Sequence, residues 1–390
     1  MVTGRDFIIT SLQPWNTEIG STIKNTALEI SKQNRVLYIN APMNWLEWRK
    51  ASKEKKERKI QQINSNMWVV NLPFSVLPLN KIPFTWAFDK VNKINNKKIA
   101  TGILKAVNDL NFHDYIHLID TDIYRSQYLK EMLHPILSIY YCRDFVVGVD
   151  YWKKNGSRLE PLLAAKSDIV LANSSLFAER FKKYNPKTYT IETGVNLQLY
   201  DATIDRDTPA DIKDIPHPIV GYTGMVIKLR LDIELLYQVA LQMPNVQFVF
   251  IGPTDEAFDT HLLHQLTNVY FLGKKEVNQL PAYIQEFDVC INPQIVNDIT
   301  IGNYPLKIDE YLAMGKPTVA TSTHTMQDIF SKYVFLPTGV NEYIESIQKA
   351  ISEIGDKTKQ KDRITFAHTH SWTNSVNKIY KAIEESEEKL

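Results

Sequence analysis

Three residues close together in the chain have the types and spacing needed to bind a sugar nucleotide. Pro305, Lys307 and Glu310 fall within the first turns of a predicted helix. The free N–H groups and positive dipole of a helix start attract an anion, and Lys307 adds a full charge there. Glu310, one turn later, can accept hydrogen bonds from hydroxyls, so the pair suits pyrophosphate and ribose. The alternative is a solvated surface helix with an i, i+3 pair.

The helix that positions these residues has a start and a stop signal. Pro305 fits a first turn because its missing N–H would be unpaired there anyway, which predicts a helix from about Tyr304. A Gly-Lys-Pro sequence ends the helix near Met314. The β-branched run Thr318–Thr321 then predicts a strand. This order of loop, helix and strand indicates an α/β protein with a doubly wound parallel sheet.

The segment PLKIDEYLAMGKPTVAT resembles the donor site of the retaining GT-B glycosyltransferases of family 4 (glycosyl transferases group 1). That family reads roughly P-L-K-x-x-E-Y-x-A-x-G-x-P-V-V, and the resemblance implies that Glu310 binds the nucleotide ribose. The family often has a second glutamate eight positions earlier, where this chain has Gly302. The resemblance then leaves the donor sugar to the backbone around this glycine, in a donor site made up of Gly302, Asn303, Tyr304, Pro305, Leu306, Lys307 and Glu310.

A second predicted donor contact follows the strand 219–223. The family has G-R-x-x-x-x-K here, and both of its cations bind the donor diphosphate. Aligned on Gly224, the lysine position holds Arg230 and the arginine position holds Met225. The resemblance implies that Arg230 stabilises the leaving pyrophosphate and that Lys228 replaces the charge lost at Met225. Alternatively, the two cations are simply exposed in a loop.

Candidate acceptor contacts lie in the first half of the chain. Gly20 precedes the predicted helix Thr22–Gln33 and can approach a phosphate or an acceptor sugar, although no G-x-G-x-x-G fingerprint of a nicotinamide enzyme is present. The strand 138–142 ends in Arg143 and Asp144, where parallel strands face a ligand crevice. Related enzymes have a similar aspartate, which implies that Asp144 contacts the acceptor hydroxyl, with Arg143 as a phosphate or structural partner. A salt bridge between the two is the alternative.

No metal and no cofactor are expected. The triplet Asp120–Asp122 matches the D-x-D metal motif of a different glycosyltransferase fold, but such triplets arise often by chance and GT-B enzymes generally need no metal. The histidines lack metal-ligand spacing, and His370 fits a packing or capping role better than a ligand role.

The segment 45–59 combines tryptophan with basic residues. Trp45 and Trp48 precede seven basic and two acidic residues. Tryptophan favours the headgroup region, and a basic residue near an anionic bilayer contributes about 1 kcal/mol. The segment therefore predicts reversible contact with an anionic membrane. The alternatives are a solvated helix with inward tryptophans, or a nucleic-acid patch that nothing else supports. The following proline-broken segment Pro73–Phe88 is not expected to be regular, and its apolar side chains can cover the cleft, dip into lipid or be buried.

The composition is that of a two-domain globular protein. The 390 residues include 44% hydrophobic and 23% charged ones, and the charge is +11 over residues 1–190 but −10 over the rest, which suggests that one domain faces an anionic partner. We expect acceptor-binding and nucleotide-sugar-binding Rossmann-like domains over 1–200 and 215–365, and a helix over 366–390 that returns to the first domain. The sequence shows no signal-peptide profile and no membrane span, and Cys142 and Cys290 lie in apolar runs typical of buried thiols. We therefore expect a cytoplasmic location, peripheral to the inner face of the membrane.

Together with these features, the resemblance implies a retaining glycosyltransferase that moves a sugar from a nucleotide sugar to a saccharide or lipid-linked acceptor in cell-surface polysaccharide synthesis. Two other classes stay open. A GT-B-fold epimerase would turn over a UDP-sugar without an acceptor. A non-catalytic subunit would bind the nucleotide sugar without hydrolysing or transferring it.

Overall fold

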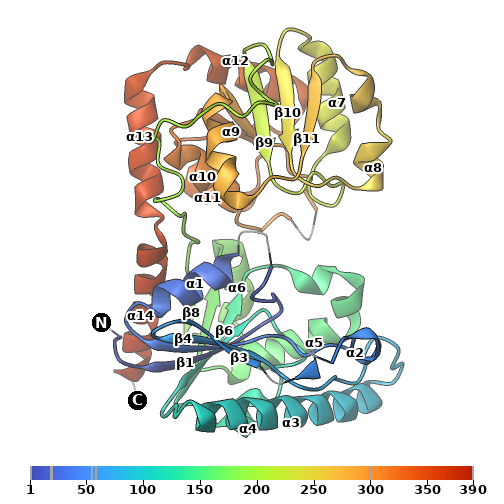
Figure 1. Ribbon diagram of the computed structural model, residues 1–390, viewed down its shortest axis with the longest axis vertical. Coiled ribbons are helices and arrows are strands. Elements are labelled where there is room, and N and C mark those ends of the chain that lie inside the picture. Colours follow the sequence, from blue (N-terminus) through green and yellow to red (C-terminus); the bar gives the residue numbers. More distant parts are fainter. Residues whose placement is uncertain (1, 18–20, 54–55, 58, 298–299, 389–390) are drawn as a thin grey trace. The chain divides into compact units, whose positions relative to one another are not determined.

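The computed structural model describes residues 2–17, 21–53, 56–57, 59–297 and 300–388 (Figure 1). It divides into two compact units. Unit 1 contains Met1–Glu192 and Ser375–Leu390, and unit 2 contains Thr193–Asn374. The chain therefore returns to unit 1 after completing unit 2.

Unit 1 is built on an eight-stranded sheet in the order β3-β4-β2-β1-β5-β6-β7-β8. Its strands are β1 (Asp6–Ser11), β2 (Arg35–Ile39), β3 (Lys59–Asn64), β4 (Met67–Asn71), β5 (Ile116–Asp120), β6 (Leu137–Cys142), β7 (Ile169–Ala172) and β8 (Thr188–Thr190). All neighbours are parallel except β3, which runs antiparallel to β4 at one edge. The strand order reverses between β1 and β5, and the carboxyl ends of strands at such a point form the usual ligand crevice.

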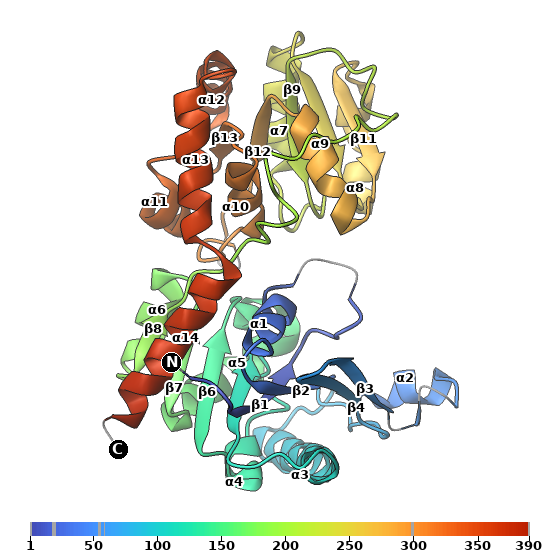
Figure 2. The same cartoon turned by 60° about the vertical axis from the view of Figure 1, so that its left-hand side comes forward.

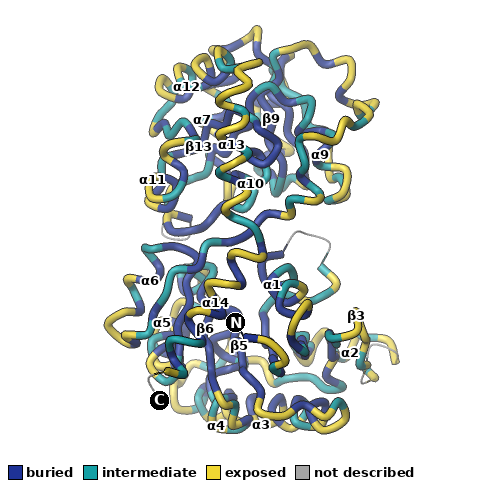
Figure 3. The backbone as a smooth tube through the Cα atoms, turned by 90° about the vertical axis from the view of Figure 1, so that its left-hand side faces the viewer, coloured by how far each residue is buried: buried dark blue, intermediate teal, exposed yellow. Residues whose placement is uncertain are grey.

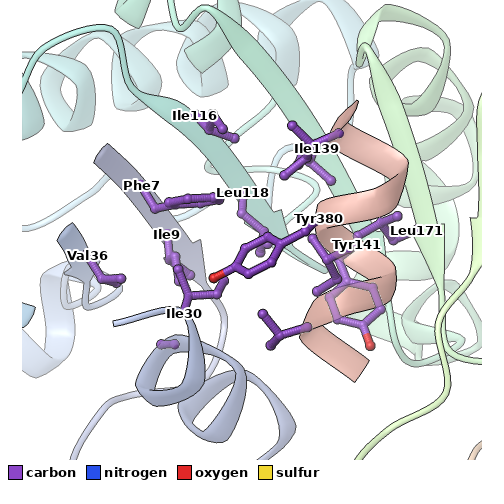
Figure 4. Packing of buried hydrophobic residues seen from close by; sticks show 14 of the residues in the cluster. Phe7, Ile9, Ile30, Val36, Ile116, Leu118, Ile139, Tyr141, Leu171 and Tyr380 are labelled. Atoms are coloured by element: carbon purple, nitrogen blue, oxygen red, sulfur yellow. The ribbon is translucent and has the colours of Figure 1, made fainter. Parts of the chain in front are cut away.

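Helices cover both faces of this sheet. They are α1 (Thr22–Ile30), α3 (Thr85–Asp109), α4 (Leu129–Leu133), α5 (Asp150–Lys166), α6 (Ser175–Lys182) and α14 (Trp372–Glu387), with a 3-10 turn, η2 (Val146–Gly148). The short helix α2 (Trp45–Lys50) buries none of its residues and covers neither face. Successive side chains of a strand point to opposite faces. Phe7 and Ile9 therefore pack with α1 and α14, and Ile8 packs with α3 and α4. Figure 4 shows Tyr380 of α14 among the side chains of the first group.

Unit 2 is built on a wholly parallel sheet of five strands in the order β11-β10-β9-β12-β13. Its strands are β9 (Ile219–Thr223), β10 (Gln247–Ile251), β11 (Val269–Gly273), β12 (Val289–Asn292) and β13 (Thr318–Ala320). The order reverses between β9 and β12, so the carboxyl ends of these two strands mark the ligand crevice of unit 2.

The helices of unit 2 also form two layers. They are α7 (Ile233–Gln242), α8 (Glu256–Asp259), α9 (Leu280–Glu286), α10 (Leu306–Ala313), α11 (His324–Phe330), α12 (Val340–Ser352) and α13 (Lys357–Thr369), with the 3-10 turns η3 (Leu262–Gln265) and η4 (Val277–Gln279). Ile219 and Cys290 pack with α9, α10, α11 and α13, whereas Val220 and Ile291 pack with α7 and α12. Figure 2 shows α10 beside β12.

The structure differs from the sequence predictions in two places. Helix α3 begins at Thr85, so the prediction that Pro73–Phe88 is not regular is wrong for Trp86 and Phe88, which are helical. Strands β3 and β4 occupy a stretch to which the sequence analysis assigned no element. The edge strand β3 is largely exposed on both faces, so it lacks the alternation that marks a strand (Figure 3).

Two further observations concern the whole chain. Cys142 and Cys290 are free and buried, as predicted. None of the helices that the structure describes combines the length and hydrophobicity that crossing a bilayer requires.

Candidate functional site

The start of α10 offers unpaired backbone donors at the ligand crevice of unit 2. Pro305 is the N-cap residue and provides no side-chain cap, because its ring carries no hydrogen-bonding group. The amide groups of Leu306 and Lys307 have no acceptor among the described residues. A helix start without a cap leaves its N–H groups and the positive end of its dipole available to an anion.

Lys307 and Gly224 are brought together at this helix start. The Lys307 Nζ atom lies 4.9 Å from the centroid of the Tyr222 ring in β9. A Cβ atom added to Gly224 would lie 3.1 Å from Lys307 Cε and 3.4 Å from Nζ. Gly224 has φ +134°, and its amide donates to the Ile251 carbonyl at 2.8 Å. The end of β9 and the first turn of α10 therefore form one small cationic site.

Lys228 and Arg230 lie in the loop between β9 and α7. The Lys228 amide donates to Asp255 at 3.0 Å, and the Arg230 carbonyl accepts from the Ile295 amide at 3.0 Å. Both side chains are exposed and make no ion pair or hydrogen bond with the part of the chain that the structure describes. The link to Ile295 holds this loop beside the segment that leads into α10, so the predicted cations lie at the same edge of the sheet as Lys307.

Glu310 is half-buried one turn after Lys307. Burial raises the pKa of its carboxyl group to about 7, and Lys307 and the Tyr200 hydroxyl oppose this shift by favouring the charged form. The Tyr200 hydroxyl is buried and has no other hydrogen-bond partner among the described residues. Hydrogen bonds donated by a ligand would stabilise the charged form of this carboxylate, and a ribose diol could provide them.

A buried carboxylate that the sequence analysis missed fixes the loop before α10. Asp309 accepts a hydrogen bond from the Tyr304 hydroxyl at 2.5 Å, and its other oxygen lies 2.8 Å from Nδ1 of His370. Tyr304 and Asp309 are fully or nearly fully buried. No sequence signal pairs Asp309 with His370, because 61 residues separate them.

The loop itself is packed tightly. The Gly302 carbonyl accepts a hydrogen bond from the Thr325 hydroxyl at 3.2 Å, and the Asn303 amide donates to the Thr300 carbonyl at 3.0 Å. The Asn303 side-chain oxygen is buried without a hydrogen-bond partner in the described part of the chain. It is a second polar group at this helix start that a ligand can satisfy.

In unit 1, Arg143 pairs with Asp120 and not with Asp144. Arg143 Nη2 donates to Asp120 Oδ2 at 2.8 Å, its Nε contacts the other carboxylate oxygen, and the Ser11 hydroxyl donates to Asp120 at 2.6 Å. The predicted alternative of an Arg143–Asp144 salt bridge is therefore wrong. The half-buried Asp144 side chain makes no ion pair or hydrogen bond with any described residue, which leaves it available to a ligand at the carboxyl end of β6.

The other residues of unit 1 that the sequence analysis singled out are Gly20 and the D-x-D triplet Asp120–Asp122. Gly20 lies outside the described residues. The D-x-D triplet is divided between two ion pairs, because Asp120 binds Arg143 and Asp122 binds Arg125 at 3.0 Å. Within the described ranges, no three histidine, cysteine or acidic side chains are arranged to hold a metal ion.

The basic segment begins with an exposed helix. Helix α2 buries none of its residues, and Trp45 is 46% exposed with the Arg49 guanidinium 4.9 Å from its ring centroid. The predicted alternative of two inward tryptophans is therefore wrong for Trp45. Lys55 and Arg58 lie outside the described residues.

Comparison with known proteins identifies similar sequences and folds. Residues 217–353 match the family Glycosyl transferases group 1. The chain is 28% identical over 206 residues to TuaH of Bacillus subtilis (strain 168), provisionally named a teichuronic acid biosynthesis glycosyltransferase. This match covers 50% of this chain and 50% of TuaH, so it spans half the length of that relative.

Solved structures resemble the whole chain. Sucrose-phosphate synthase from Thermosynechococcus elongatus matches with a TM-score of 0.72 and 16% identity over 98% of both chains. HepE from Anabaena, in complex with UDP, matches with a TM-score of 0.67 and 13% identity over 98% of this chain and 100% of HepE. The fold is therefore the two-domain GT-B fold, as predicted.

Proposed function

Because residues 217–353 form a domain of the glycosyl transferases group 1 family, we propose that this protein is a retaining glycosyltransferase using a nucleotide-sugar donor. The observation that carries the proposal is the position of Lys307 beside Gly224, at an uncapped helix start one turn before Glu310. A cationic site followed by a carboxylate suits the diphosphate and the ribose of one ligand.

Catalysis in this proposal is electrostatic. The bond between the anomeric carbon and the diphosphate oxygen breaks, and the acceptor hydroxyl oxygen bonds to that carbon from the same face. The hydroxyl proton passes to the departing diphosphate, so no protein nucleophile is needed. Lys307, Arg230, Lys228 and the free amides of α10 stabilise the charge that develops on the leaving group.

The proposed donor is a UDP-sugar and the proposed acceptor is a lipid-linked saccharide. HepE, which shares the fold, was solved with UDP. TuaH is named for teichuronic acid biosynthesis. The exposed Trp45 and the basic residues around it favour work at the inner face of an anionic membrane. The unpaired Asp144 carboxylate is the proposed contact for the acceptor hydroxyl.

The test begins with donor binding. Thermal unfolding is measured with UDP-, GDP- and ADP-sugars, because a ligand that binds only the folded state raises its melting temperature. The donor that binds is then incubated with lipid-linked saccharides, and release of the nucleotide is measured together with the elongated acceptor. We expect nucleotide release that depends on acceptor, and a product of retained configuration.

Other outcomes would replace the proposal. Interconversion of the sugar nucleotide without acceptor would identify an epimerase. Binding without turnover, across a panel of acceptors, would identify a non-catalytic subunit. An inverted product would remove the retaining mechanism.

A further inference from the structure

Unit 1 contains a pocket of about 380 Å³ that plays no part in the site described above. The loop 79–83 forms one side, and the beginning of α5 forms the other. The pocket is lined by Leu79, Asn80, Lys81, Ile82, Pro83, Phe88, Tyr124, Asp150, Tyr151, Lys154 and Asn155. Tyr124 follows β5 and Tyr151 follows β6, so the pocket lies at the carboxyl side of the sheet, as Asp144 does.

Aromatic and aliphatic side chains line the pocket together with polar ones. The rings of Phe88 and Tyr124 meet edge to face at 5.0 Å, and Trp152 supports Tyr124 from behind at 4.2 Å. The Tyr124 hydroxyl donates to the carbonyls of Tyr151 and Trp152, each at 3.3 Å. The aromatic and aliphatic side chains give a hydrocarbon chain a surface to pack against, and the polar lining residues can contact a charged headgroup beside it.

Two cations stand at the rim. Lys154 Nζ donates to the Pro83 carbonyl at 2.7 Å, which leaves its other N–H groups for a ligand. Lys81 is exposed on the facing loop and makes no ion pair with the described residues. Asp150 is the acidic lining residue, so the rim keeps a net positive charge. A phosphate is an anion that two lysines at a partly apolar pocket can bind.

Large exposed apolar side chains lie next to the pocket loop in the chain. Phe84 and Trp86 follow the pocket loop directly, are 62% and 70% exposed, and stack with ring centroids 6.4 Å apart. Leu77, on the other side of the loop, is also exposed, and Asn95 holds its backbone by two hydrogen bonds of 2.9 Å. Exposed tryptophan and phenylalanine on a fixed backbone fit the membrane interface.

We propose that this pocket binds the phosphate and the first prenyl units of a polyprenyl-phosphate acceptor lipid, while Phe84 and Trp86 enter the bilayer around it. This inference rests on the proposed transferase function and deepens it by placing the lipid end of the acceptor. The proposed ligand is a membrane lipid and not free phosphate, because a pocket for free phosphate would not need exposed apolar side chains beside it.

The experiment measures binding of the full-length protein to three kinds of vesicle. They are phosphatidylcholine alone, phosphatidylcholine with a polyprenyl phosphate, and phosphatidylcholine with phosphatidylglycerol at equal surface charge. We expect the tightest binding to polyprenyl-phosphate vesicles. The double variant Lys81→Ala, Lys154→Ala should lose about 30-fold on these vesicles, at about 1 kcal/mol per lysine, and much less on phosphatidylglycerol. The double variant Phe84→Ala, Trp86→Ala should lose binding to both anionic vesicles.

The controls are Lys361→Ala and Ile354→Ala, which change an exposed lysine and an exposed apolar side chain of unit 2. Melting curves establish that each variant is folded. Equal wild-type binding to the two anionic vesicles, or unchanged binding by the lysine variant, would overturn the inference, and competition by inorganic phosphate alone would reassign the pocket to a soluble anion. Because vesicle binding needs no donor, donor-dependent transfer to a soluble saccharide would still support the transferase function after such a result.

Discussion

Gly224 and Lys307 lie so close together that a side chain at the first would press on the second. A Cβ atom at Gly224 would stand 3.1 Å from Lys307 Cε, in a backbone conformation with φ +134° that residues with a side chain rarely adopt. The proposed diphosphate site therefore depends on the absence of a side chain at the end of β9.

Gly224→Ala should lower both stability and donor binding. The strained backbone costs about 1–3 kcal/mol of unfolding free energy, measured by urea denaturation. The donor-induced rise in melting temperature should disappear as well, because Lys307 is displaced. Gly355→Ala is the matched control, since Gly355 also has positive φ but has open space around it. If Gly224→Ala still bound the donor, the contact between Gly224 and Lys307 would not be part of the donor site.

Glu310 should make donor binding depend on pH. Its pKa of about 7 means that the hydrogen-bond-accepting carboxylate is lost as the pH falls through 7. Donor affinity should therefore fall by up to about tenfold per pH unit below 7. Glu310→Gln should bind donor weakly at every pH between 5.5 and 8.5. Titration calorimetry measures donor affinity across this range. A wild-type affinity that does not change with pH would contradict the proposal that Glu310 binds the ribose.

The same shift predicts the pH dependence of stability without ligand. The folded-state pKa of Glu310 is raised, so its stabilising contribution is complete below the unfolded-state pKa and is lost as the pH rises through 7. The melting temperatures of Glu310→Gln and the wild type should therefore be close at pH 5. At pH 8 the Glu310→Gln variant should melt at the higher temperature.

Arg230→Ala should slow transfer strongly. Loss of one donor to a developing oxyanion typically costs about a hundredfold in kcat. Lys213→Ala is the control, because it also removes an exposed charge from unit 2. A decrease in kcat of less than threefold would remove Arg230 from the mechanism.

Asp144 and Arg143 should behave differently when changed. Asp144→Asn should reduce acceptor-dependent transfer and leave both the melting temperature and donor binding as they are, since the Asp144 side chain makes no ion pair or hydrogen bond with a described residue. Arg143→Ala should cost about 3–5 kcal/mol of stability, because it leaves the fully buried Asp120 carboxylate without its cation. Chemical denaturation and steady-state kinetics on the two variants test this contrast, and a destabilised Asp144→Asn would point to a structural role.

Neutralising Lys53, Lys56 and Lys59 should weaken binding to anionic liposomes by about 1 kcal/mol per residue, and by less at high salt. A variant lacking Lys213, Lys357 and Lys361 carries the same change of charge on unit 2. Equal losses for the two variants would mean that net charge, and not the segment 45–59, governs the interaction.

The sequence predicted the features that depend on local pattern. The start of α10 and the strands β6, β9 and β13 each follow from a few neighbouring residues. The pairs Asp120–Arg143 and Asp309–His370 could not be predicted, because tertiary contacts join residues far apart in the chain. The edge strand β3 was not predicted for a different reason. Because it is exposed, its sequence lacks the alternation of apolar and polar residues that indicates a strand.

The return of α14 to unit 1 has a consequence for how the protein is made on the ribosome. Val376, Ile379, Tyr380 and Ile383 belong to the same core as the strands of the first half of the chain, and the Asn34 side chain donates to the Tyr380 hydroxyl at 2.8 Å. Domains tend to fold in the order in which they are translated. Here the unit that is synthesised first must wait, its core open on one side, until unit 2 has been synthesised.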